Sequence, residues 1–253
     1  MSIDHSEWTT AALEMRTDYL AERHQALNQQ LDQKELDWWH LAQEHLRHQP
    51  DANTAAILSS QCKRRLREQS VPGGEGWSTV QLARTLLLAQ VLEHHRGAQV
   101  SFLHQLFQWG DDQEKSAIVK AFDCLDSTGR CLKLALEAGR TSNPQVFAAL
   151  ALDTPYPARH YPERPYNQLV LKALGMGLDA SRLNGLSQRH GVTLNQLAMD
   201  LLDEQLAAGR TVSPGLSLLI AFNQLSPAQR QRLRGLDQQQ RLPSEWHEHL
   251  TET

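Results

Sequence analysis

The chain has 253 residues, with 25 Lys and Arg against 29 Asp and Glu, and 40% of the residues are hydrophobic. This size and composition fit one large domain or two small ones with a substantial core, which excludes a disordered tail. The net charge of −4 argues against non-specific nucleic-acid binding. Because no apolar run is long enough to span a bilayer and the N-terminus lacks a signal-peptide pattern, we expect a cytoplasmic protein without membrane insertion.

Leucine usage predicts an all-α fold. The chain has 41 Leu against 13 Val and Ile together, and leucine loses little side-chain freedom in a helix, whereas β-branched residues favour strands. Short connections between helices favour antiparallel hairpins, arranged as an irregular α-solenoid or a helical bundle. In chain order, the predicted helices lie near residues 4–31, 33–48, 52–69, 78–95, 98–109, 112–125, 128–140, 144–152, 165–176, 180–190, 194–208, 214–223 and 227–241.

Capping chemistry predicts where many of these helices begin. In a capping box, the first side chain accepts from a backbone N–H and the side chain three residues later reaches back. Such pairs are Asp32 with Glu35, Ser78 with Gln81, and Thr193 with Gln196. A capping residue before a proline is a second start signal, because the missing N–H of the proline costs nothing in the first turn. These pairs are Asn143-Pro144, Ser213-Pro214 and Ser226-Pro227.

Two segments interrupt the helical pattern. The glycine-rich stretch 71–76 is predicted to be a flexible loop. The family resemblance described below implies that it separates an N-terminal helical part, residues 1–70, from a helical domain, residues 77–242, that precedes a tail, residues 243–253. The second segment, residues 152–166, holds four prolines and three tyrosines. Its proline spacing predicts an extended path without a helix, and ordered loops of this length are often functional.

Several charged motifs fit structural roles better than a metal site. Glu44, His45 and His48 share a helical face, but no second helix offers matching ligands, which favours a solvated helix end. Asp111 to Glu114 are similar to the paired carboxylates that hold magnesium and diphosphate, but Lys115 stands where the pattern needs an acid. Acidic residues are also expected in a first helical turn. We therefore predict neither a metal nor a cofactor.

The three cysteines fit a reducing compartment. Cys62, Cys124 and Cys131 are odd in number and lack the paired spacing of a zinc or disulfide framework, so we expect buried thiols. A redox pair of Cys124 and Cys131 is the alternative.

The stretch from Arg140 to Lys172 is the predicted ligand-binding segment. Gln168 and Lys172 share a helical face, with Asn167 adjacent. Tyrosines 156, 161 and 166 can supply aromatic walls, and such a mixture suits a pocket for a small polar-aromatic ligand. The alternative is a loop that Arg140 and Asn167 brace through backbone carbonyls.

A family resemblance is carried by residues in this same stretch and on either side of it. They are Arg140-Thr-Ser-Asn143-Pro-x-Val146-Phe147, Ala151-x-x-Thr154-Pro155-Tyr156-Pro157-Ala158, Tyr166-Asn167-Gln168-x-Val170-Leu171-Lys172-Ala173-Leu174, Gly185-Leu186 and Ala208-Gly209-Arg210-x-Val212-x-Pro214. Upstream they are Trp77, Ala83-Arg84-x-Leu86-Leu87-Leu88, Leu106-Phe107, Asp111 and Glu114. Over roughly residues 75–222 the sequence resembles the EboA family, encoded in gene clusters linked to movement of secondary-metabolite precursors. Thr154 departs from an expected Asn, and Tyr166 from an expected Trp.

The resemblance implies a cytoplasmic, non-catalytic helical protein that takes part in metabolite traffic. Its partners would be a small-molecule metabolite precursor and other gene-cluster proteins. The predicted ligand-binding residues are Arg140, Asn143, Tyr156, Tyr166, Asn167, Gln168, Lys172 and Arg210. One alternative is an enzyme that modifies a small metabolite, with Lys172 or His160 as the acid-base group. Another is a scaffold that only docks proteins.

Overall fold

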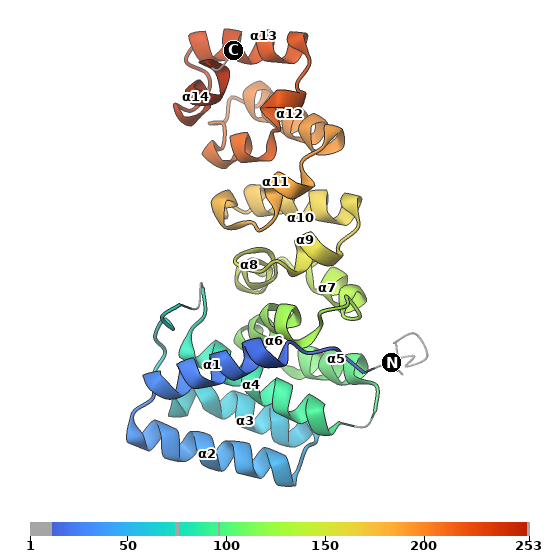
Figure 1. Cartoon of the computed structure of the whole chain (residues 1–253). Helices are drawn as coiled ribbons and strands as arrows, with labels where there is room; N and C mark the ends of the chain where they lie inside the picture. Colours follow the sequence, from blue (N-terminus) through green and yellow to red (C-terminus); the bar gives the residue numbers. More distant parts are fainter. Residues whose placement is uncertain (1–11, 74–75, 96, 252–253) are drawn as a thin grey trace. The chain divides into compact units, whose positions relative to one another are not determined.

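The computed structural model describes residues 12–73, 76–95 and 97–251, and the regular structure in these residues is helical (Figure 1). Ser70 and Ser78 form an isolated antiparallel β-bridge. The predicted all-α fold is confirmed.

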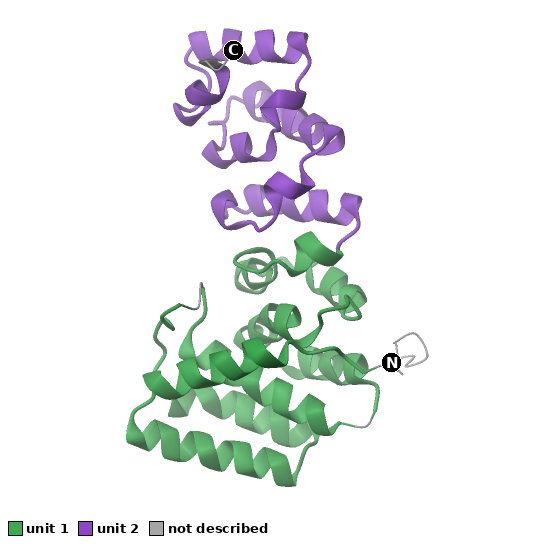
Figure 2. Ribbon diagram, viewed as in Figure 1, with its two compact units in different colours: residues 1–160 green, residues 161–253 purple. Residues whose placement is uncertain are grey.

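The chain divides into two compact units, residues 1–160 and 161–253 (Figure 2). The helices of unit 1 are α1 (Thr17–Gln30), α2 (Gln33–His48), α3 (Ala52–Arg65), α4 (Thr79–His94), α5 (Gln99–Trp109), α6 (Asp112–Leu125), α7 (Leu132–Ala138), α8 (Pro144–Ala151) and α9 (Tyr156–His160). Those of unit 2 are α10 (Glu163–Gly175), a 3₁₀ helix (Ala180–Arg182), α11 (Leu186–Arg189), α12 (Val192–Ala207), 3₁₀ helices Pro214–Leu219 and Phe222–Gln224, α13 (Pro227–Gln238) and α14 (Glu245–Thr251).

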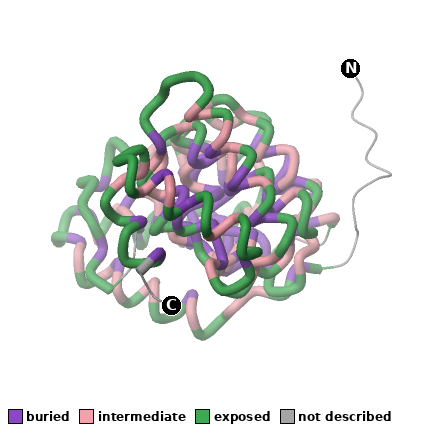
Figure 3. Tube along the Cα trace, turned by 90° about the horizontal axis from the view of Figure 1, so that it is seen from above, coloured by how far each residue is buried: buried purple, intermediate pink, exposed green. Residues whose placement is uncertain are grey.

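Helix α4 is the centre of unit 1. It contacts α1, α2, α3 and α6, and almost all of its residues from Thr79 to Leu92 are buried. A helix that is apolar on every side has no solvent face to offer, so it must be enclosed by other helices. Figure 3 shows that buried and exposed residues alternate along the helices. The buried and mainly apolar stretch from Leu82 to Ala89 therefore makes α4 the core helix of unit 1.

Most of the predicted helix starts are confirmed. Both hydrogen bonds of the capping box are present for the first two predicted pairs, and Ser226 forms a further box with Gln229. The Asn143 side chain accepts from the backbone N–H groups of Gln145 and Val146. Two predictions are wrong in detail: α12 begins one residue before Thr193, after Gly191, and Ser213 precedes a 3₁₀ helix without capping it through its side chain.

The first predicted helix is too long at its N-terminal end. Residues 12–16 are not helical, and α1 begins at Thr17. The backbone N–H of Arg16 donates to Cys124 O at 2.8 Å, and Ser127 N–H donates to Glu14 O at 2.9 Å. These long-range bonds hold the segment against the end of α6 and replace the hydrogen bonds of a helix. Residues 4–11 of the predicted helix lie outside the described residues.

The proline-rich segment contains a short helix, so the prediction that its prolines forbid one is wrong. Helix α9 begins directly after Pro155, and Pro157 is its second residue. Pro165 likewise lies in the first turn of α10. Because first-turn N–H groups have no partner within a helix, a proline there removes no helical hydrogen bond.

Three further differences lie in unit 2. The predicted helix 180–190 is divided into Ala180–Arg182 and α11, because Gly185 adopts a left-handed conformation with φ of +75°. The predicted helix 214–223 consists of two 3₁₀ helices. Helix α14 was not predicted, and its Trp246 is fully buried. That burial ties the last helix to its unit.

The glycine-rich loop lies within unit 1. Val71 N–H donates to Trp77 O at 3.0 Å, so the loop is closed at its base, and the Lys120 ammonium donates to Gly76 O. The domain boundary that we placed at 71–76 stays a prediction.

Candidate functional site

The eight predicted ligand-binding residues are divided between the two units. Unit 1 holds Arg140, Asn143 and Tyr156, and unit 2 holds Tyr166, Asn167, Gln168, Lys172 and Arg210. Each set is considered within its own unit.

In unit 1, the Asn143 carboxamide forms structural hydrogen bonds. Its Oδ1 accepts the N–H groups of Gln145 and Val146 at 2.9 and 3.1 Å, which caps α8. Its Nδ2 donates to Asp112 Oδ2 at 2.7 Å, which joins α8 to α6. Arg140, by contrast, is exposed.

Tyr156 belongs to a buried polar network around Asp126. Its hydroxyl donates to Asp126 Oδ2 at 2.7 Å, and the backbone N–H of Cys131 donates to the same oxygen at 2.6 Å. The N–H and hydroxyl of Thr128 donate to Asp126 Oδ1. Burial alone would raise the pKa of Asp126, but these hydrogen bonds lower it below its usual value. The network joins α9 to the loop after α6.

His160, the acid-base residue of the enzyme alternative, packs beside Tyr156. Their ring centroids are 4.6 Å apart. The imidazole also lies so close to the backbone of Gly129 that a Cβ there would be 2.7 Å from Nδ1. Burial lowers the pKa of His160, which favours the neutral ring.

In unit 2, Tyr166 is the first buried residue of α10. Its hydroxyl donates to Asn184 O at 2.9 Å, and the Arg189 guanidinium lies 4.7 Å from its ring centroid. Arg189 also donates to Tyr161 O at 2.7 Å. The Tyr161 hydroxyl is buried, and within the described residues it has no hydrogen-bond partner.

Asn167 and Gln168 point in different directions from α10, because neighbouring residues of a helix lie about 100° apart. Asn167 is only 2% exposed, whereas Gln168 is exposed and Lys172 is half-buried. In the part of the chain that the structure describes, neither Oδ1 nor Nδ2 of Asn167 has a hydrogen-bond partner. The structure therefore does not bring the Asn167 carboxamide together with Gln168, although the two are adjacent in sequence.

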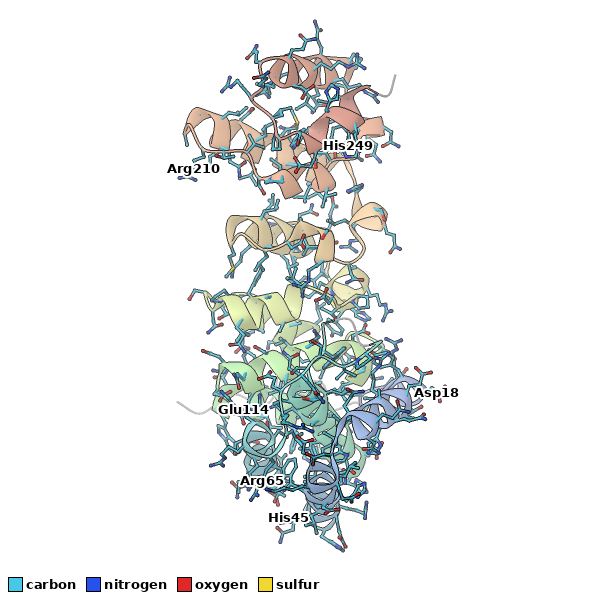
Figure 4. All side chains as sticks on the ribbon, turned by 90° about the vertical axis from the view of Figure 1, so that its left-hand side faces the viewer. Asp18, His45, Arg65, Glu114, Arg210 and His249 are labelled. Atoms are coloured by element: carbon cyan, nitrogen blue, oxygen red, sulfur yellow. The ribbon has the colours of Figure 1, made fainter. Side chains whose placement is uncertain are left out.

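Arg210 follows α12 and is exposed at the edge of unit 2 (Figure 4). Its Nη1 lies 3.9 Å from Glu204 Oε1, a surface ion pair that contributes little to stability.

The structural interpretation of the other motifs is confirmed. His48 and Glu44 form an exposed pair 3.9 Å apart at the end of α2. Asp111 and Glu114 form a capping box at the start of α6. All three cysteines are free and buried, and burial raises the pKa of Cys62 and of Cys124 to about 12. Among residues 12–73, 76–95 and 97–251, no cluster of His, Cys, Asp or Glu is arranged to hold a metal ion.

Fold and site together define an all-helical protein with a buried carboxamide on α10 that has no hydrogen-bond partner among the described residues. Comparison with protein-family models matches residues 54–221 to the family described as metabolite traffic protein EboA. Because this match covers more than half of the chain, the protein belongs to the EboA family. No curated protein and no solved structure matches the chain. No helix of the described residues is both long and apolar enough to cross a membrane.

Proposed function

We propose that this EboA-family protein binds a small secondary-metabolite precursor in the cytoplasm and hands it to other proteins of the same gene cluster, without catalysing a reaction. Family membership supports the general role in metabolite traffic. The observation that carries the binding step is the burial of Asn167 on α10. Of the predicted ligand residues in unit 2, it is the buried one whose polar side-chain atoms have no hydrogen-bond partner among the described residues.

A buried carboxamide without partners is costly. Leaving a buried donor or acceptor unsatisfied costs about 1–3 kcal/mol, and Asn167 has both kinds of atom. Natural proteins keep such groups where they serve a purpose, such as holding a water or a ligand. The Tyr161 hydroxyl is a second buried group of this kind in the same unit. A metabolite with paired donor and acceptor atoms, such as an amide or a hydroxylated ring, would satisfy Asn167.

Unit 2 also offers a matched control for this argument. Asn195 is 3% exposed, but its Oδ1 accepts Ala221 N–H at 2.8 Å and its Nδ2 donates to Ala221 O at 3.3 Å. Asn195 is therefore a buried asparagine that braces the fold.

We expect Asn167→Leu to leave the free energy of unfolding unchanged or to raise it by about 1 kcal/mol, because an apolar group of similar size replaces an unsatisfied amide. Asn195→Leu should lower it by about 2–4 kcal/mol, because two backbone groups lose their partners. Urea denaturation measures both. Mass spectrometry of each protein, purified gently from its own cell extract, should detect a bound metabolite with the native chain and lose it with Asn167→Leu.

Two outcomes would contradict the proposal. If Asn167→Leu is as destabilising as Asn195→Leu, then Asn167 is a brace. If the variant retains the metabolite, the binding site lies elsewhere. Conversion of the metabolite by the native chain would favour the enzyme alternative.

A further inference from the structure

Unit 1 contains a cleft that includes none of the predicted ligand residues. It lies among α3, α4, α5 and α6 and has a cavity volume of about 50 Å³. Trp109, which is 57% exposed, belongs to its lining, so the cleft reaches the surface. Its walls are mainly apolar, formed by Ala55, Ala56, Leu87, Leu88, Leu106 and Ile118.

A buried cation lines this apolar cleft. Arg84 of α4 is only 3% exposed, and its Nε donates to Ser59 O at 3.1 Å. Its other guanidinium nitrogens make no hydrogen bond or ion pair with any described residue. Arginine stays charged in proteins, so its remaining N–H groups need acceptors that the walls do not supply.

A carboxylate lines the same cleft. Glu114, labelled on α6 in Figure 4, accepts the backbone N–H of Asp111 through Oε2 at 3.0 Å. Its Oε1 is buried and lacks a hydrogen-bond partner in the described ranges. Arg84 and Glu114 do not form an ion pair with each other within the described chain. One cleft thus holds a cation whose two remaining guanidinium nitrogens have no acceptor among the described residues, and a carboxylate oxygen that has no donor among them.

We propose that the cleft binds a small zwitterion with an apolar side chain, in the manner of a branched α-amino acid. A carboxylate would meet Arg84, an ammonium would meet Glu114, and the side chain would lie on the leucine and alanine walls. Charge balance favours this class: with Arg84 and Glu114 the complex is neutral, whereas a ligand with only one charge leaves a net charge in a poorly solvated site.

The direct test uses calorimetric titration of the full chain with three probes that share the same branched apolar group. L-Valine carries both charges, 3-methylbutanoate lacks the ammonium, and 2-methylpropylamine lacks the carboxylate. L-Valine should bind at least about tenfold more tightly than either analogue, because each analogue leaves one buried charge without its partner. Tryptophan fluorescence, to which Trp109 in the lining of the cleft contributes, gives an independent readout.

Two variants test which residue binds each charged group of the ligand. Arg84→Met should weaken L-valine and 3-methylbutanoate by about tenfold and leave the amine unchanged. Glu114→Gln keeps the helix cap and should weaken L-valine and the amine instead. Ala56→Leu, on the wall of the cleft, should weaken all three probes, whereas Ala52→Leu on the same helix lies outside the lining and should change none of them.

The proposal would be overturned if none of the probes binds the native chain, or if all three bind equally. It would also be overturned if L-valine binds Arg84→Met and Glu114→Gln as tightly as the native chain, and melting temperatures show that both variants are folded. None of these outcomes bears on Asn167, which lies in the other unit.

Discussion

Replacing Asp126 with alanine is expected to lower the free energy of unfolding by about 4 kcal/mol, because the Tyr156 hydroxyl and the Cys131 N–H lose their shared acceptor at about 1–3 kcal/mol each. Asp126 is fully buried, so water cannot replace the lost oxygen without opening the structure. Thr128 loses two further hydrogen bonds to the same side chain.

Urea denaturation with two companion variants tests this expectation. Tyr156→Phe removes one of the hydrogen bonds and should cost about 1–2 kcal/mol. Asp200→Ala changes an exposed aspartate of α12 and should shift stability by no more than about 0.5 kcal/mol. Equal effects of Asp126→Ala and Asp200→Ala would mean that the network does not stabilise unit 1.

Local signals predicted the helices well, since capping is a short-range interaction. Asp32 with Glu35 and Ser78 with Gln81 lie three residues apart, so the sequence holds both partners. The errors have long-range causes. Residues 12–16 are not helical because they bond to the end of α6, more than a hundred residues away.

The orientation of Asn167 could have been predicted from helical spacing. It lies three residues before Val170 and seven before Leu174, and both of these residues are buried. Helical periodicity therefore places Asn167 on the apolar face, whereas Gln168 shares its face with Lys172. Adjacency in the sequence was the wrong guide, because neighbours in a helix point about 100° apart.

The sequence also contains a signal for the cleft of unit 1. Arg84 is the one charged residue in the otherwise uncharged stretch 79–92, and this stretch is too apolar to have a solvent face. A charge within such a stretch predicts a buried polar site. The other polar residues of the cleft, Ser59 and Glu114, could not be predicted, because only tertiary packing brings them to the same cleft as Arg84.

Glu35 should make the stability of unit 1 sensitive to acid. Its side chain is 7% exposed, and Oε1 accepts Arg67 N–H at 2.7 Å. The Arg67 guanidinium lies 3.2 Å from Oε2, which also accepts Asp32 N–H. Burial alone would raise the pKa of Glu35, but the hydrogen bonds from Arg67 and Asp32 lower it from 4.5 to about 2.

A carboxyl group whose pKa is lowered by folding stabilises the native state above its unfolded pKa. That contribution falls as the pH decreases from about 4.5 to about 2, because the unfolded chain takes up the proton first. The shift corresponds to at most about 3 kcal/mol. Glu35→Gln keeps a capping side chain but cannot titrate, so its stability should depend less on pH in this window.

Urea denaturation of the native chain and of Glu35→Gln at pH 7, 4, 3 and 2.5 isolates this contribution, since every other carboxyl group titrates in both proteins. The native chain should be more stable by about 2–3 kcal/mol at pH 7, and the difference should shrink steadily towards pH 2.5. Arg67→Met should reduce the same difference, because it removes the two guanidinium hydrogen bonds to Glu35 and keeps only the backbone N–H of residue 67. A constant difference at all four pH values would show that Glu35 stabilises α2 by packing and capping alone.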